Sequence, residues 1–219
     1  VNLVRYTGGS PSTVAAIAQD INSEHRCLLG VKFVGDEFDI YFNNANIGSY
    51  TNTIPALSSS NVIGLGFNTI DSDGDGTGTY PSEVDNGKSK ILHFEFNPTQ
   101  RFSDRSYDLP ERYFYDTFSD ESTGTAIDEH APNINRFGEA AWQTESGGLV
   151  AVHADGYAYW NGTDVQDGDE ASYAPILSTD GFVQATITPY NSGLGTLRAP
   201  ALGYRFNQFN DEGLFTYLD

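Results

Sequence analysis

Strict alternation of apolar and polar residues is the feature of this sequence that most constrains its fold. In the segment 38–43 (FDIYFN), each apolar position on one side of the chain is followed by a more polar position on the other. A period of two is what a half-buried antiparallel strand requires, because successive side chains of a strand point to opposite faces. Segments of the same kind recur along the chain: Cys27–Val34, Val62–Asn68, Lys90–Asn97, Tyr157–Trp160 and Gly181–Pro189. The sequence therefore predicts an all-β chain.

Turn residues separate these segments. Gly35-Asp36 and Asn43-Asn44 lie between apolar runs, where they predict tight hairpin turns. One segment departs from the pattern, since Thr13–Ile21 is rich in Ala and carries apolar residues at helical spacing. It predicts one short helix, and the β-branched residues among its apolar positions leave a strand as the alternative.

The composition agrees with strands joined by turns. Of the 219 residues, 38% are hydrophobic and 13% aromatic, and 23 are Gly. Aromatic and Thr residues favour strands, whereas Gly, Asn and Asp favour turns. The length suits one large β-sandwich or two small ones.

The charge balance restricts the partners. The chain has 30 acidic and 11 basic side chains, which gives a formal net charge of −19 at pH 7. Such a surface repels phosphate backbones, so we expect no nucleic-acid partner. No stretch approaches the roughly 18 apolar residues of a membrane span. The acidity suits an extracellular or virion protein that stays in solution through its charge.

A single cysteine, Cys27, excludes an internal disulfide framework. It begins an apolar segment, so we expect a buried thiol that behaves as a small hydrophobe rather than as a nucleophile.

A run in the middle of the chain has a distinctive order of residues. It comprises an aromatic strand, a Gly-Thr turn, a His-x-Pro step and a tryptophan: Phe114, Asp116, Phe118, Gly124, Thr125, His130, Pro132 and Trp142. The run resembles the opening of concanavalin A-like (laminin-G-like) jelly-roll domains of phage and bacterial surface proteins. Leu28–Phe67 resembles the later half of such a domain, and Lys90–Phe96 its closing strand. The resemblance implies an antiparallel jelly-roll β-sandwich.

The order of these parts is reversed here, because the closing strand precedes the opening one. Both ends of the sequence, VNLVRY and GLFTYLD, also read as strands. The chain is therefore divided into residues 1–97, a polar linker or arm at 98–112, and residues 113–219. Three arrangements stay open: one circularly permuted sandwich, halves completed between subunits, and two small sandwiches.

An acidic loop suggests a calcium site. Asp71, Asp73 and Asp75 occupy alternate positions before Gly76, as at the start of a calcium loop, and Glu83 is a fourth oxygen donor nearby. Position 12 of the loop is Ser82 and no flanking helices are apparent, so this is not an EF-hand. The alternatives are a Ca²⁺-stabilised loop and a solvated acidic turn.

Two further patterns bear on carbohydrates. Glu37 and Asp39 match part of the Glu-x-Asp-x-x-Glu strand of jelly-roll glycoside hydrolases, but Phe42 stands where the general acid belongs, so we expect no enzyme. A second group combines aromatics with an amide and a carboxylate that suit sugar binding: Tyr157, Tyr159, Trp160, Asn161 and Asp164. The alternative to sugar binding is a purely structural role, in which the two tyrosines pack on a sheet face while Trp160 fills the core.

The sequence thus predicts a non-enzymatic structural or adhesion protein of a virion or extracellular assembly, of the phage tail, fibre or capsid-decoration type. We expect it to act through subunit interfaces of a homo-oligomer or larger assembly. Three arginines of the arm are candidate contacts: Arg101, Arg105 and Arg112. The alternative is a calcium-dependent carbohydrate-binding module with a glycan partner.

Overall fold

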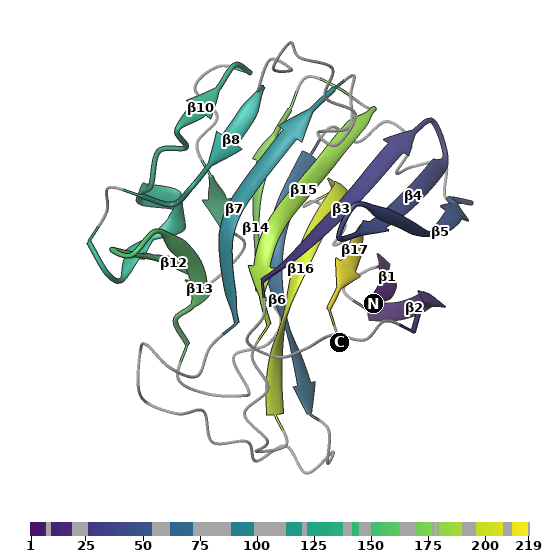
Figure 1. Cartoon of the computed structure of the whole chain (residues 1–219), viewed down its shortest axis with the longest axis horizontal. Coiled ribbons are helices and arrows are strands. Elements are labelled where there is room, and N and C mark those ends of the chain that lie inside the picture. The colour runs from purple at the N-terminus through teal and green to yellow at the C-terminus, as the bar shows by residue number, and fades with distance from the viewer. Residues whose placement is uncertain are drawn as a thin grey trace.

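The computed structural model is an antiparallel β-sandwich built from two large sheets (Figure 1). It describes residues 1–7, 10–18, 26–53, 62–71, 89–98, 113–119, 122–137, 142–144, 150–162, 170–176, 178, 180–189, 196–207 and 212–218. One turn of 3-10 helix, η3 (Ile127–Glu129), is the only helical segment in these ranges. The predicted all-β fold is therefore confirmed.

Sheet A has seven strands. Their order across the sheet is β11 (Gln143–Thr144), β14 (Glu170–Pro175), β6 (Val62–Asp71), β16 (Thr196–Asn207), β17 (Glu212–Tyr217), β1 (Asn2–Thr7) and β2 (Ser10–Ala16).

Sheet B has ten strands. The main order is β5 (Ala45–Thr51), β4 (Glu37–Phe42), β3 (Cys27–Val34), β15 (Gly181–Thr188), β7 (Lys90–Asn97), β13 (Tyr157–Trp160), β12 (Val150–His153) and β9 (Thr125–Ala126). Two short strands, β8 (Phe114–Asp116) and β10 (Ile134–Asn135), continue from the other end of β7. Sheet B is therefore forked along β7, with β13 beside its beginning and β8 beside its end (Figure 1).

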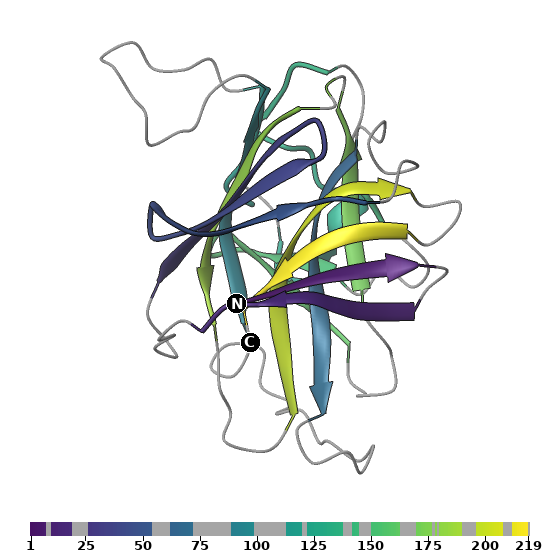
Figure 2. The same ribbon diagram turned by 90° about the vertical axis from the view of Figure 1, so that its right-hand side faces the viewer.

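Both sheets combine strands from the two halves of the sequence. In sheet B, β15 lies between β3 and β7, and in sheet A, β6 lies between β14 and β16. The first and last strands also pair, with Asn2 opposite Tyr217 and Tyr6 opposite Gly213, and both views show them side by side (Figures 1 and 2). The two halves therefore share one core, and the chain closes sheet A with its own ends.

That core lies between the sheets and is rich in aromatic rings. Tyr204 of sheet A stacks on Phe33 of sheet B at 5.9 Å and contacts Phe38 at 5.3 Å, measured between ring centroids. Leu3 near the beginning of the chain and Leu218 near its end belong to the same cluster. Burial of such rings is the main favourable contribution to the stability of a sandwich.

The two hairpin turns occur where the sequence predicts them. Gly35 has φ +56° between β3 and β4, and Asn43 and Asn44 have φ +48° and +69° between β4 and β5. Positive φ at both central residues is typical of a type I′ turn, which matches the twist of a hairpin.

The expected helix at 13–21 is wrong in its described part. Residues 10–16 form strand β2, which pairs with β1 along its length, and the strand alternative is correct. The gain from completing a sheet edge over a core outweighs the helix propensity of its alanines.

Candidate functional site

Two buried carboxylates lie on neighbouring strands of sheet B. Glu95 is on β7 and Asp116 on β8, and both are fully buried. Phe94 is opposite Asp116 and Glu95 is opposite Tyr115, so the two carboxylates point to opposite faces of the sheet. Asp116 faces the core, and Glu95 faces away from it.

The Asp116 carboxylate accepts hydrogen bonds from three donors. Oδ1 accepts from the backbone N–H of Phe118 at 2.8 Å, and Oδ2 accepts from Trp142 Nε1 at 2.6 Å. His130 Nε2 lies 2.9 and 3.1 Å from the two oxygens. The tautomer in which Nε2 carries the proton lets His130 donate to this carboxylate. We call Asp116, His130 and Trp142 the core polar cluster.

The local backbone is shaped around this cluster. Phe118 has φ +54°, a conformation that is rare for a bulky residue. The Phe118 N–H donates a hydrogen bond to Asp116 Oδ1. The Phe118 ring packs near the rings of Trp142 and His130, with centroid distances of 6.2 and 6.1 Å. The hydrogen bond and the ring packing together hold this turn of the chain.

The core polar cluster explains why the motif of the sequence has its order. The aromatic strand of the motif (Phe114–Asp116), His130 and Trp142 come together in the fold, and the ring centroids of Phe114 and Trp142 are 5.1 Å apart. Gly124 adopts φ +91° in the turn before β9. Asp116 is 0% and His130 2% exposed, so the pair is enclosed in the core.

A second cluster surrounds Glu95 on the outer face of sheet B. Gln184 Nε2 of β15 donates to Glu95 Oε1, and His93 Nε2 lies 3.4 Å from Glu95 Oε2. The Tyr115 ring packs edge-on against His93 at 4.9 Å. His93 is 22% exposed and is the most accessible member of the Glu95–Gln184–His93 set.

The sequence did not single out this second cluster, because Glu95 and Gln184 are 89 residues apart. The only local indication in the sequence is that His93 and Glu95 share one side of the alternating segment 90–97 (KILHFEFN). Strict alternation along this segment would place Ile91 on the same face as His93 and Glu95, but Ile91 lies in the core. A bulge between Ile91 and His93, opposite Thr186 and Ile187, switches the faces.

The candidate sugar-binding residues do not form one platform. Tyr157 and Tyr159 pack together on the outer face of sheet B, whereas Trp160 lies in the core. Tyr157 is buried, its ring stacks on that of His153 with the centroids 4.5 Å apart, and the Lys90 ammonium lies 4.4 Å from its ring centroid. Asn161 is exposed beyond β13, and Asp164 lies outside the described residues.

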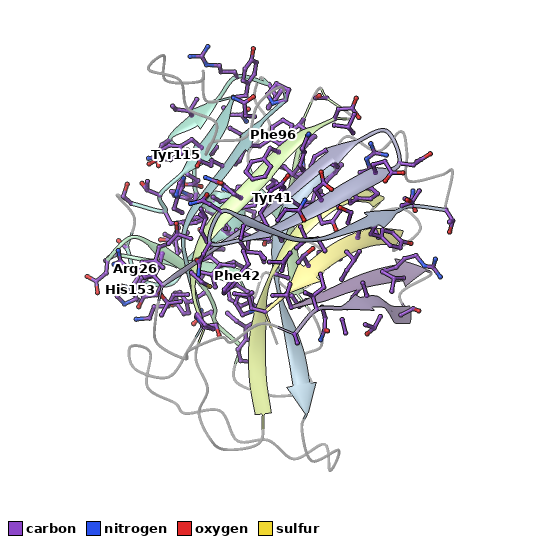
Figure 3. All side chains as sticks on the ribbon, turned by 45° about the vertical axis from the view of Figure 1, so that its right-hand side comes forward. Arg26, Tyr41, Phe42, Phe96, Tyr115 and His153 are labelled. Carbon is purple, nitrogen blue, oxygen red and sulfur yellow. The ribbon has the colours of Figure 1, made fainter. Side chains whose placement is uncertain are left out.

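The labelled side chains show how the outer face is divided. His153 lies on the side of β12, Tyr115 on the side of β8 and Tyr41 nearer β4 (Figure 3). Tyr41 packs edge-on against Phe182 at 5.6 Å in a separate aromatic pair. The outer face therefore carries several small side-chain clusters.

The partial glycosidase pattern on β4 is occupied by structural contacts. Asp39 accepts a hydrogen bond from Ser49 Oγ at 2.5 Å, and Glu37 accepts one from Thr51 Oγ1 at 3.0 Å. Phe42, at the position of the missing acid, packs in the core on the opposite face.

The candidate calcium ligands fall largely outside the described residues. Asp71 ends β6, with its backbone opposite Thr196, and Asp73, Asp75 and Glu83 lie beyond the described ranges. Within those ranges, no group of three or more His, Cys, Asp or Glu side chains is placed to hold a metal ion. The three candidate interface arginines of the arm, Arg101, Arg105 and Arg112, also lie outside the described residues.

Cys27 is a buried thiol, as expected. Its Sγ lies 3.5 Å from the carbonyl oxygen of Ile187, and burial raises its pKa to about 11. At neutral pH it is a protonated small hydrophobe.

A buried cation ties the two sheets together at one end. Arg205 of β16 has φ +53°, and its guanidinium lies over the rings of Phe33 and Phe38. Its Nη2 is 3.4 Å from Asp180 Oδ1, which also accepts the N–H of Gly35 at 2.8 Å. Burial lowers the pKa of Arg205, and the nearby carboxylates of Asp180 and Asp36 oppose that shift.

No protein-family model matches the chain, and no curated protein matches it. No helix of the described part of the chain is long and apolar enough to cross a membrane.

Proposed function

We propose that this chain is a non-enzymatic structural or adhesion protein of a virion or other extracellular assembly. The observation that carries the proposal is the use of both buried carboxylates as fixed hydrogen-bond acceptors on opposite faces of sheet B. Such clusters give a rigid scaffold that can present surfaces to partners.

The separation of the two carboxylates supports a role without turnover. A glycosidase needs two carboxyl groups on the same side of a bound sugar, roughly 5–10 Å apart. Asp116 is enclosed in the core, whereas Glu95 lies on the other side of the sheet. The two side chains do not meet across a common substrate.

The resemblance of Phe114–Trp142 to jelly-roll domains of phage and bacterial surface proteins favours the virion or extracellular location. A net charge of −19 suits a protein that stays in solution outside cells. An extracellular assembly also needs subunit contacts, and we expect a homo-oligomer or a larger assembly.

Glycan binding is the second candidate function. Within the second cluster, the His93 imidazole, 22% exposed, and the partly exposed Tyr115 ring beside it are the groups that a sugar can reach, and such groups bind sugar hydroxyls and ring faces. Calcium at the Asp71–Asp75 loop would assist such binding.

A panel of polysaccharides separates these functions. The purified chain is incubated with each glycan with and without a calcium chelator, and both retention of the protein and release of reducing ends are measured. Our proposal predicts no release of reducing ends. Release that is lost in Glu95→Gln or Glu37→Gln would overturn the non-enzymatic function, and chelator-sensitive retention without release would favour the glycan-binding module.

A further inference from the structure

Strand β5 is a long, uncharged edge of sheet B. In the described part of the chain its strand neighbour is β4, and Ala45, Asn46, Ser49 and Thr51 are exposed. Its seven residues, ANIGSYT, include no charged residue and no proline, although 19% of the chain is charged. By contrast, the edge strands β9 and β11 have two residues each, and the edge strand β2 contains a proline, Pro11. A long edge without charge or proline is a template for another strand.

The direction of the backbone groups on β5 follows from its pairing. Asn52 donates its N–H to Asp36 O at 2.7 Å, on the side of β4. Since this direction alternates along an antiparallel strand, Tyr50 also faces β4, whereas Ser49 and Thr51 direct their N–H and C=O groups to the open side. A bulge near Asn46 limits the regular part of the edge to Gly48–Thr51.

We propose that β5 pairs with β5 of a second copy of this chain, antiparallel across a two-fold axis, and joins two B sheets into one. The inference rests on the proposed function, for which it supplies the subunit interface. With the axis at Tyr50, Ser49 of each copy faces Thr51 of the other. The N–H and C=O groups of Ser49 in each copy then meet those of Thr51 in the other, so both copies use the same surface, as an isologous interface requires.

The composition of β5 lets a second copy approach along this edge without bringing like charges together, and its Ser and Thr side chains suit pairing with the same strand. Two chains of net charge −19 repel each other, so they associate best through a surface that carries no charge of its own. The acids nearest the edge, Asp39 and Glu37, accept hydrogen bonds from Ser49 and Thr51 of their own chain. The edge thus presents hydroxyl groups, which suit cross-strand pairing of Ser and Thr.

Proline substitution at Ser49 tests the pairing against a matched control. Ser49→Pro removes the N–H that faces the second copy and keeps those that face β4, whereas Ser49→Ala keeps every N–H. Both variants lose the hydrogen bond to Asp39. We expect Ser49→Pro to weaken self-association, measured by sedimentation velocity, by about tenfold or more, and Ser49→Ala to change it by about threefold or less.

The outcomes separate this inference from the function on which it rests. If the wild type associates and a folded Ser49→Pro variant associates equally well, the β5 interface is overturned and the chain assembles through another surface. A wild type that never associates would overturn the interface and the proposed assembly together. If Ser49→Pro does not fold, hydrogen exchange of the wild type decides: the Ser49 and Thr51 amides must gain protection as protein concentration rises, and unchanged exchange in an associating protein would contradict the pairing.

Discussion

Removal of the Asp116 charge is the most informative change at the scale of single residues. In Asp116→Asn the new amide group opposes one of the N–H donors of His130, Trp142 or Phe118, which then stays buried without an acceptor. We expect a loss of about 2–4 kcal/mol in the free energy of unfolding, measured by urea denaturation. Asp128→Asn is the control, because Asp128 is exposed and accepts one long hydrogen bond from Thr144 at 3.3 Å. Equal stability of the two variants would show that the core polar cluster contributes little.

Cys27 gives a prediction for alkaline pH. Burial raises its pKa from 9.0 to about 11, so the folded state favours the neutral thiol. Its contribution to stability is complete below pH 9 and is lost as pH rises from 9 to about 11, by up to about 3 kcal/mol. Cys27→Ala removes this part of the pH dependence, which denaturation curves across that range measure. Tyr204, whose pKa burial also raises, titrates in both proteins and cancels in the comparison. Parallel pH profiles for the wild type and Cys27→Ala would contradict the shift.

At the residue scale, sequence reasoning identified side chains and missed how they meet. Asp116, His130 and Trp142 were named through a resemblance, yet their hydrogen bonds depend on a left-handed turn at Phe118 that no local pattern indicates. No local pattern indicates Gln184, because only strand pairing brings its partner Glu95 to it. Prediction of contacts between residues far apart in sequence requires knowledge of the strand order, and the hydrophobic periodicity of the sequence does not give that order.

At the scale of elements, the burial of β1 leads to a prediction about the closure of sheet A. Leu3 of β1 is fully buried in the common core. We expect Leu3→Ala to lower the free energy of unfolding by about 2–5 kcal/mol, because it leaves a cavity between the sheets. Ser12→Ala on the neighbouring strand β2 is the control, since Ser12 is exposed. A small effect of Leu3→Ala in thermal or urea unfolding would mean that β1 is not part of the cooperative core.

Each segment with a period-two pattern forms a strand, and the departures from the predicted faces and elements have local causes. The alternation in 38–43 and the turns on either side of it match β4 and its hairpins. Residues 10–16 form a strand because they pair with β1, although their alanines favour a helix. Ile91 changed faces because of a bulge, which inserts one residue and reverses the alternation beyond it.

At the scale of the whole molecule, the two halves of the sequence build one sandwich. β15 separates β3 from β7, and β1 pairs with β17, so neither half has a complete sheet of its own. The sequence left three arrangements open, because a strand pattern specifies faces and not neighbours. Because β1 and β17 pair within one chain, sheet A needs no second subunit to join them, and β5 of sheet B is the edge that we propose for the subunit interface.

The molar mass in solution tests the central claim of an assembling, non-enzymatic sandwich most directly. Light scattering is recorded over a range of protein concentrations, at low and high salt and with a calcium chelator. Our account predicts a mass above that of one chain that rises with concentration and with salt, because salt screens the repulsion between acidic subunits. The mass of a single chain under every condition would contradict it.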